Sequence, residues 1–501
     1  MLLYRPKQER YIFIIQKTHY YLLCQVLEAE RIIMKIANVR LSGLEMKNLK
    51  NVNYGKVSFV NARKSFKASV LGLYGQNGSG KTALIDAVLL LKYALIGQPV
   101  PAYFADYVNV DADSATLRYD LTVVNGEGKS YLVTYELSVS KNTDVLLQSP
   151  GLFHPGELFK TLIFDEKLSY PCRCANGKEI MQTVIDTRNT DSFGPASKLE
   201  VLTNGNKAVL NDLIVARKLT AAMSRSYCFS RELLDIIRKN CQDRHHLDIF
   251  NALVNYGNTE LFVIKTNNTG LISLDALPLA FKYEEKNTKA IGNLAIALNG
   301  TTHVPRNVYN LVLKVFDDMN IVLKKIVPGL TISVKKLGEQ VLEDGADGVK
   351  IQLMSQKNSK EIPLQYESEG IKKIVSILHL LIVIYNNASI TVAVDELDSG
   401  IFEYLLGELL RIVSERGKGQ LIFTSHNLRP LETLDRGFVA FTTSNPNNRY
   451  IRFTNVKNNN NLRDFYYRDI MLGEQNEIVY EPTHNEEISF AFRKAGELGG
   501  A

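Results

Sequence analysis

The spacing of apolar and polar positions predicts a strand-rich region at the start of the folded part of the chain. Three short apolar segments are typical of strands, and a glycine-rich turn after the third leads into a segment with helical periodicity. Further along, two alternating segments flank Asn125-Gly126-Glu127-Gly128, the pattern of a β-hairpin. The predicted elements are strands at 35–44, 56–60 and 68–74, a helix at 82–96, and hairpin strands at 117–124 and 131–139.

A different pattern follows residue 370, where strands apolar at consecutive positions alternate with helices. A helical segment at 370–385 precedes a strand at 390–394, a helix at 401–415 and a strand at 420–425. Strands of this kind are buried on both faces, as in parallel sheets covered by helices. The sequence therefore predicts an α/β fold class.

The same patterns divide the chain into five parts. Between 195 and 330 the strand signal fades and helical segments at 231–240 and 307–326 remain, so we expect a helical insertion there. Residues 1–33 precede a natural start at Met34, and we expect them to be an appended leader that is not native, with an amphipathic helix as the alternative. The remaining parts are the two pieces of the head, at 34–194 and 331–480, and a tail at 481–501.

The strongest chemical signal is a glycine-rich loop of the form GxxxxGK[ST] between the strand at 68–74 and the helix at 82–96. The glycines let backbone N–H groups turn toward a phosphate, and the start of the helix adds a favourable dipole. In this pattern Lys81 reaches the terminal phosphates of ATP, and the hydroxyl of Thr82 is a ligand of Mg²⁺. The loop is Gly75-Gln76-Asn77-Gly78-Ser79-Gly80-Lys81-Thr82.

A second signal lies where the apolar strand at 390–394 ends in Asp395 and Glu396. In a P-loop enzyme an acidic residue at this place holds the Mg²⁺ ion, the role expected of Asp395. Glu396 is placed to act as the general base toward the attacking water. The alternative for this acidic pair is a favourable charge at a helix N-terminus, and Asp398 can be read as a helix N-cap.

His426 follows the strand at 420–425, at the sheet edge where ligands bind in open α/β folds. We expect its imidazole to donate a hydrogen bond to the γ-phosphate. Capping or packing is the alternative role.

The order of glycine-rich loop, insertion, Asp-Glu strand and Ser-His strand resembles ABC/SMC-type ATPases, in particular the branch related to the overcoming-lysogenization-defect (OLD) ATPases. This resemblance covers about residues 34–190 and 330–470 and implies a head with a mixed sheet and an antiparallel β lobe. It also implies a signature loop, in which Ser368 and Gly370 would contact ATP bound to the opposite subunit of a homodimer. The loop matches a degenerate ESxG form of the motif, and Ser368 can also be read as a helix N-cap.

Composition narrows the setting. Five cysteines scattered over 501 residues argue against a disulfide framework and indicate a reducing, cytoplasmic environment. No run of 18 apolar residues predicts a membrane span. The net charge of +6 is too small to indicate nucleic-acid binding by itself, although a local basic cluster at Arg63, Lys64 and Lys67 keeps it open.

The resemblance implies an ATPase without its own effector. OLD-type relatives carry a C-terminal nuclease, but the 75 residues after His426 contain no clustered carboxylates. An RNase-like pair of Arg238 and His245, or metal binding by His245 and His246, is disfavoured against a solvated helix end. We therefore expect a nucleotide-switched dimer that controls a separate nuclease or toxin, similar to ATPase subunits of anti-phage defence systems. The alternative is a DNA-binding ATPase of the SMC or recombination type, and a transporter motor is disfavoured.

Overall fold

The computed structural model describes most of the chain, with gaps between the parts that follow. The described residues are 12–16, 20–28, 38–63, 67–125, 127–142, 160–173, 178–265, 276–285, 288–297, 300–341, 347–357, 360–454, 461–473 and 475–498.

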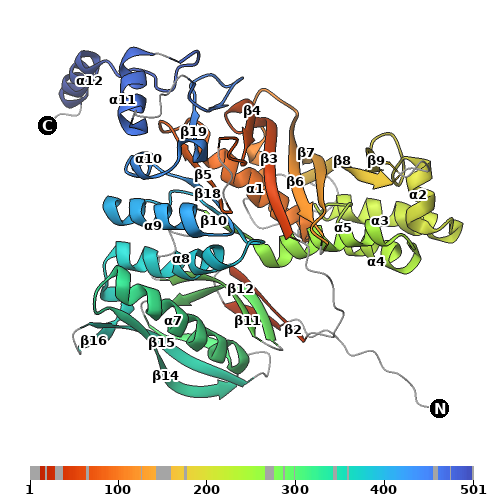
Figure 1. Cartoon of the computed structure of the whole chain (residues 1–501), viewed down its shortest axis with the longest axis horizontal. Helices are drawn as coiled ribbons and strands as arrows, with labels where there is room; N and C mark the ends of the chain where they lie inside the picture. Colours follow the sequence, from red (N-terminus) through yellow and green to blue (C-terminus); the bar gives the residue numbers. More distant parts are fainter. Residues whose placement is uncertain are drawn as a thin grey trace.

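A six-stranded sheet forms the centre of the molecule (Figure 1). Its first five strands are mutually parallel, and the sixth pairs antiparallel at one edge. Most of its residues are buried, which explains why the strand sequences are apolar at consecutive positions. In spatial order the strands are β10 (Leu261–Ile264), β17 (Thr391–Val394), β18 (Gln420–Thr424), β5 (Ser69–Tyr74), β19 (Val439–Thr442) and β20 (Tyr450–Ile451).

A second six-stranded sheet is antiparallel throughout and forms the β lobe. Its strands alternate between buried and more exposed positions, as expected of a sheet with one covered face. Its order is β4 (Val52–Ser58), β3 (Asn38–Leu49), β6 (Ser114–Val124), β7 (Ser130–Asn142), β8 (Lys160–Arg173) and β9 (Glu179–Asp186).

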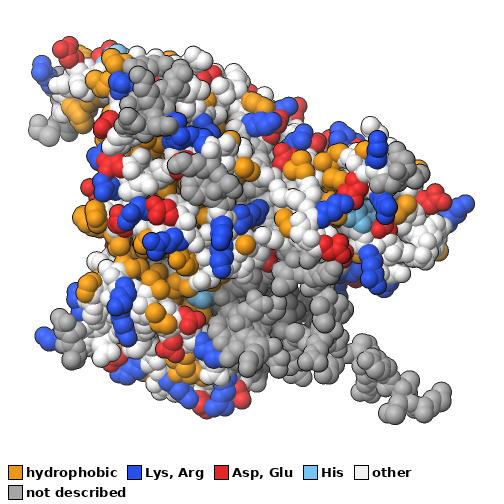
Figure 2. Space-filling view, in the orientation of Figure 1, with side chains coloured by type: hydrophobic (Ala, Val, Ile, Leu, Met, Phe, Trp, Pro, Cys, Tyr) orange, Lys and Arg blue, Asp and Glu red, His pale blue; other side chains and the backbone are white. Residues whose placement is uncertain are grey.

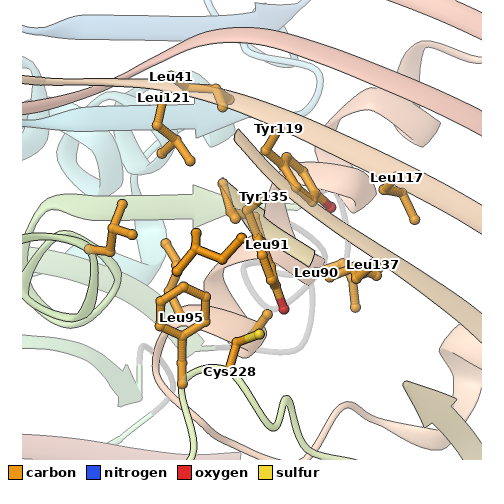
Figure 3. Packing of buried hydrophobic residues seen from close by; sticks show 14 of the residues in the cluster. Leu41, Leu90, Leu91, Leu95, Leu117, Tyr119, Leu121, Tyr135, Leu137 and Cys228 are labelled. Carbon is orange, nitrogen blue, oxygen red and sulfur yellow. The ribbon is translucent and has the colours of Figure 1, made fainter. Parts of the chain in front are cut away.

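Helix α1 (Lys81–Leu95) packs between the lobe and the central sheet and is buried on nearly every face. Figure 3 shows Leu90, Leu91 and Leu95 of α1 among leucines and tyrosines of the lobe strands. Leu71 and Ile422 of the central sheet belong to the same apolar cluster. The first helix after the glycine-rich loop is therefore held rigidly from both sides.

The opposite face of the central sheet is covered by three helices, which Figure 1 shows stacked beside it. Val392, Leu421 and Phe423 alternate with the residues that face α1 and pack in this second cluster. A smaller antiparallel sheet lies beyond these helices. The elements are α7 (Arg306–Ile326), α8 (Glu369–Asn386) and α9 (Glu403–Arg416), with β13 (Thr302–Pro305), β14 (Thr331–Val341), β15 (Asp347–Lys357) and β16 (Lys360–Pro363).

The predicted fold class, α/β with a mixed sheet and an antiparallel lobe, is confirmed, but the segment 195–330 is only partly helical. Four helices occupy its first half, and strands occupy much of the second half. Strand β10 even belongs to the central sheet, because four apolar residues are too few to distinguish a strand from a helix by periodicity. The elements are α2 (Ala196–Thr203), α3 (Leu210–Ala222), α4 (Arg231–Asn240), α5 (Arg244–Asn255), β11 (Ala276–Glu285) and β12 (Thr288–Ala297).

The two ends of the chain add further elements. Strands β1 (Ile12–Gln16) and β2 (Tyr20–Glu28) form a sheet with β11 and β12, so the helical alternative for residues 1–33 is wrong at these positions. The domain bounds and the non-native origin of 1–33 stay predictions. The C-terminal region carries α10 (Pro430–Thr433), α11 (Leu462–Leu472) and α12 (Asn485–Leu498). Within the described part of the chain, no helix has the length and apolarity to cross a membrane.

Candidate functional site

The glycine-rich loop joins β5 to α1 in a conformation that only glycine adopts easily. Gly75, Gly78 and Gly80 have φ angles of 155°, 74° and 91°. A Cβ on Gly75 would lie 1.7 Å from Thr442 Oγ1, so the close packing of β19 also requires glycine there. A Cβ on Gly78 would meet no atom within 4 Å, so the loop borders open space at this residue.

Hydrogen bonds to the loop fix its shape. Ser79 Oγ donates to the carbonyl of Gln76 at 2.7 Å and lies 2.5 Å from Thr442 Oγ1. The Tyr450 hydroxyl donates to the carbonyl of Gly80 at 2.8 Å. The edge strands β19 and β20 therefore hold the loop from one side.

Lys81, the first residue of α1, folds its side chain back over the loop. Its Nζ donates to the carbonyls of Gly75 and Gln76, each at 2.8 Å. Burial lowers the pKa of Lys81 to about 8, and nearby carboxylates, Asp395 first among them, oppose this shift. The ammonium thus lies between the loop and an acidic group.

Asp395 follows β17 and lies beside the start of α1. Thr82 Oγ1 donates to Asp395 Oδ1 at 3.4 Å, and Thr424 Oγ1 donates to the same oxygen at 2.6 Å. Asp395 is buried, and its backbone N–H donates to Ile264 O of β10 at 2.8 Å. Three strands or strand ends therefore determine where this carboxylate lies.

Glu396 has a φ of 49°, which is rare for a residue with a side chain. Its backbone N–H donates to Thr424 Oγ1 at 2.8 Å. Thr424 thus contacts both acidic residues, and its hydroxyl ties the end of β18 to the end of β17. Sequence reasoning missed Thr424, whose one signal is a hydroxyl residue at the end of an otherwise apolar strand.

Asp398 is not the cap of the following helix, because α9 begins at Glu403 and is preceded by Phe402 at its N-cap. Instead, Asp398 Oδ2 accepts hydrogen bonds from the N–H groups of His426 and Asn427, at 3.0 and 2.9 Å. His426 is therefore anchored through its backbone. Burial lowers the pKa of His426, and Lys81 lowers it further, so its imidazole is neutral at physiological pH.

Ser368 lies at the N-cap of α8, where its Oγ accepts a hydrogen bond from the N–H of Ile371 at 3.4 Å. The capping alternative for Ser368 is therefore confirmed, while its contact with a second protomer stays a prediction. Gly370 packs directly on the segment after the acidic pair, because an added Cβ would lie 2.2 Å from Gly400 O. The predicted signature loop and the acidic loop are thus neighbours.

The two histidines considered as alternative sites have structural roles. His246 Nδ1 lies 2.7 Å from the Tyr170 hydroxyl, and burial lowers the pKa of His246 to about 4. His245 Nε2 lies 2.7 Å from Pro171 O, and Arg238 donates to Asn251. Among the described residues, no three His, Cys, Asp or Glu side chains gather as a metal site.

Of the predicted site residues, the structure brings the glycine-rich loop, Asp395, Glu396 and His426 to one edge of the central sheet. This edge is the carboxyl end of the parallel strands, where ligands bind in open α/β sheets. Ser368 and Gly370 lie beyond it, next to Gly400. Of the basic cluster, Arg63 forms an ion pair with Asp435 at 3.7 Å, and Lys64 lies outside the described residues.

Comparison with known proteins finds one relevant sequence similarity. No family model matches the chain. It is 26% identical over 111 residues to SbcC, the larger-named component of the nuclease SbcCD, from Clostridium acetobutylicum, a match that covers 22% of this chain. The chain matches only 8% of that relative's length.

Among solved structures, the chain is similar to the SMC head domain from Thermotoga maritima, with a TM-score of 0.35 and 14% identity over 83% of this chain and 99% of that one. It is also similar to the recombination mediator protein RecF with ATP, with a TM-score of 0.31 and 14% identity over 78% and 94% of the two chains. TM-scores this low carry no argument, so the fold description rests on this chain's own topology. That topology and the SbcC match agree with an ABC/SMC-like P-loop head.

Proposed function

We propose that this protein binds and hydrolyses ATP with Mg²⁺, as an ABC/SMC-like ATPase. One observation carries the proposal: the glycine-rich loop and the acidic strand end meet, with Thr82 Oγ1 at 3.4 Å from Asp395 Oδ1. Glycine-rich turns and acidic strand ends are each common alone. Their meeting at the carboxyl edge of a parallel sheet is what a P-loop site requires.

The residues present fit a nucleotide and its metal. Open space beside Gly78 leaves room for phosphate groups, and the Lys81 ammonium is satisfied for now by two carbonyls of the loop. Thr82 and Asp395 supply the hydroxyl and carboxylate oxygens that Mg²⁺ prefers. Bound there, Mg²⁺ would neutralise charge on the phosphates.

Each remaining residue has a role that follows from its place. Glu396 is the general base toward water, and His426 donates a hydrogen bond to the γ-phosphate. Ser368 and Gly370 would contact the nucleotide held by a second copy of the chain, which makes ATP part of the interface of a homodimer. Hydrolysis would then release the two heads.

We further propose that the nucleotide state of this dimer controls a separate effector protein, a nuclease or a toxin, in defence against phage. The relative named as part of the SbcCD nuclease supports a nuclease as the partner class. The defence role rests on the motif order shared with the OLD-type branch.

The test of the ATPase proposal is light scattering of Glu396→Gln with and without ATP and Mg²⁺, beside phosphate release by the wild type. The glutamine keeps the shape of the side chain and removes the base. We expect slow hydrolysis by the wild type, a loss of about 100-fold or more in the variant, and a dimer that forms only with ATP.

Glu487→Gln is the matched control, because Glu487 is exposed on α12. It should hydrolyse ATP and stay monomeric like the wild type. A Glu396→Gln protein that remains monomeric at saturating ATP would remove the two-headed model. Undiminished turnover by that variant would remove Glu396 as the base.

A second candidate function is a DNA-binding ATPase for repair or maintenance, which the match to SbcC also favours. On the face shown in Figure 2, the basic and acidic side chains of the described residues are interspersed, without a continuous basic stripe. Binding to long duplex DNA that is stronger with ATP and weakens steeply with salt would support this function. No binding at low salt would exclude it.

A further inference from the structure

A buried lysine on α8 contacts the backbone of the acidic loop. Lys373 is 2% exposed, and its Nζ donates a hydrogen bond to the carbonyl oxygen of Glu396 at 3.3 Å. Burial lowers the pKa of Lys373 to about 8, and the Asp398 carboxylate is the first of the nearby groups that oppose this shift. Lysine is rarely buried so completely without a specific partner. Its contact here is with the residue proposed as the general base.

The conformation of Glu396 explains why such a contact matters. A non-glycine residue at a φ of 49° costs on the order of 1 kcal/mol and persists only where its surroundings hold it. The N–H of Glu396 is held by Thr424 Oγ1 at 2.8 Å, and its carbonyl is held by Lys373. The peptide groups on both sides of the Glu396 Cα are therefore restrained by different elements, β18 and α8.

We propose that Lys373 is a positioning residue, which holds the backbone of Glu396 in this conformation and so determines where the Glu396 carboxylate can act. The inference rests on the proposed ATP hydrolysis. Lys373 does not touch the nucleotide in this account. Its effect on hydrolysis passes entirely through Glu396.

The place of Lys373 on α8 gives the contact a further consequence. Helix α8 begins just after Ser368, and Gly370 packs on Gly400 of the acidic loop. The residues proposed to contact a second protomer and the residue that holds Glu396 thus lie within the first turns of one helix. Placement of α8 by a partner head would therefore change how well the base is positioned.

The test compares Lys373→Met with Lys373→Arg in steady-state hydrolysis and in nucleotide binding by the full chain. Methionine keeps the length of the side chain and removes its donor. We expect kcat to fall about 10-fold or more in Lys373→Met, with KM and the Kd for a fluorescent ATP analogue within about threefold of the wild type. Arginine, which still donates, should restore part of kcat.

Lys92→Met is the matched control. Lys92 is a lysine of α1 whose Nζ donates to Leu261 O at 2.8 Å, and burial lowers its pKa to about 8 as well. It makes the same kind of bond to a carbonyl that is not part of the acidic loop. We expect Lys92→Met to lose stability comparably and to keep the wild-type kcat.

The outcomes separate this inference from the ATPase proposal. An unchanged kcat in Lys373→Met, a matching loss of nucleotide affinity, or an equal loss of kcat in Lys92→Met would each overturn the positioning role. If wild-type hydrolysis is absent or insensitive to Glu396→Gln, the ATPase proposal itself fails. Should Lys373→Met not fold, Lys373→Gln keeps a donor without the charge, and a kcat near that of the wild type would then show that the hydrogen bond is the active feature, whereas a kcat as low as that of Glu396→Gln would overturn it.

Discussion

The glycine-rich loop and the acidic loop lie at the same sheet edge but are built in opposite ways. The glycine-rich loop is one continuous stretch whose glycines take positive φ angles and whose lysine bonds to the loop's own carbonyls. The acidic loop holds a strained Glu396 only because Thr424 and Lys373 reach it from two other elements. A local sequence pattern can thus specify the first, whereas the second depends on tertiary contacts.

The difference also divides the expected functions. The glycine-rich loop offers a cation and backbone donors, which bind phosphate whether or not hydrolysis follows. The acidic loop offers a metal ligand and a base, which act on bound nucleotide. Changes in the first should therefore alter affinity, and changes in the second should alter turnover.

The largest effect is expected for Lys81→Ala, which removes the cation of the glycine-rich loop. We expect nucleotide binding to weaken and hydrolysis to fall by about 100-fold or more, because the backbone alone cannot offset the phosphate charge. Nucleotide titration and phosphate release measure this, with Lys239→Ala on the exposed end of α4 as the control. Wild-type turnover in the purified Lys81→Ala protein would contradict a role for the loop in ATP hydrolysis.

Thr424→Val should act on the acidic loop alone. Valine keeps the shape of the side chain but removes the hydroxyl that contacts Asp395 and Glu396. We expect kcat to fall about 10-fold and the nucleotide Kd to change little, because the positions of the base and the metal ligand are loosened. A rise in Kd with an unchanged kcat would show that the division between the two loops is wrong.

Thr442→Val is the counterpart at the glycine-rich loop and should have a smaller effect. The change removes the hydroxyl that contacts Ser79 and packs against Gly75. We expect a severalfold rise in the nucleotide Kd and in KM, with kcat close to that of the wild type, because only the shape of the loop is relaxed. Isothermal titration beside steady-state kinetics separates this result from that of Thr424→Val.

The smallest effect on hydrolysis, none, is expected for Lys92→Met, which lies outside both loops and affects stability instead. Burial lowers the pKa of Lys92 to about 8, so the unfolded chain binds this proton more tightly than the folded protein. Lys92 therefore opposes folding below about pH 8, and this effect disappears as the pH rises toward the ordinary lysine value of 10.5.

Urea unfolding of the wild type and Lys92→Met at pH 7 and pH 10 measures this linkage. Between these values, the difference in the free energy of unfolding should move in favour of the wild type by about 1–2 kcal/mol. A difference that does not change with pH would mean that the lysine is not buried in solution.

Much of the site could be predicted because its parts are local. The strand, loop and helix from Ser69 to Leu95 follow from an apolar run, spaced glycines and helical periodicity. The strand before Asp395 and the strand before His426 were equally recognisable as buried strands. Strand β10 was missed because its four residues carry too short a pattern.

The sequence by itself determined the order of these elements and the chemistry at their ends, since apolar periodicity and glycine placement act over a few neighbouring residues. Only the tertiary structure decided that Thr424 and Lys373 hold Glu396, and that Asp398 binds the backbone of His426 instead of capping α9. These contacts join residues 23 to 28 positions apart in sequence. A single side chain that meets a distant backbone leaves no periodic trace in the chain, because its partner is set by how strands and helices pack.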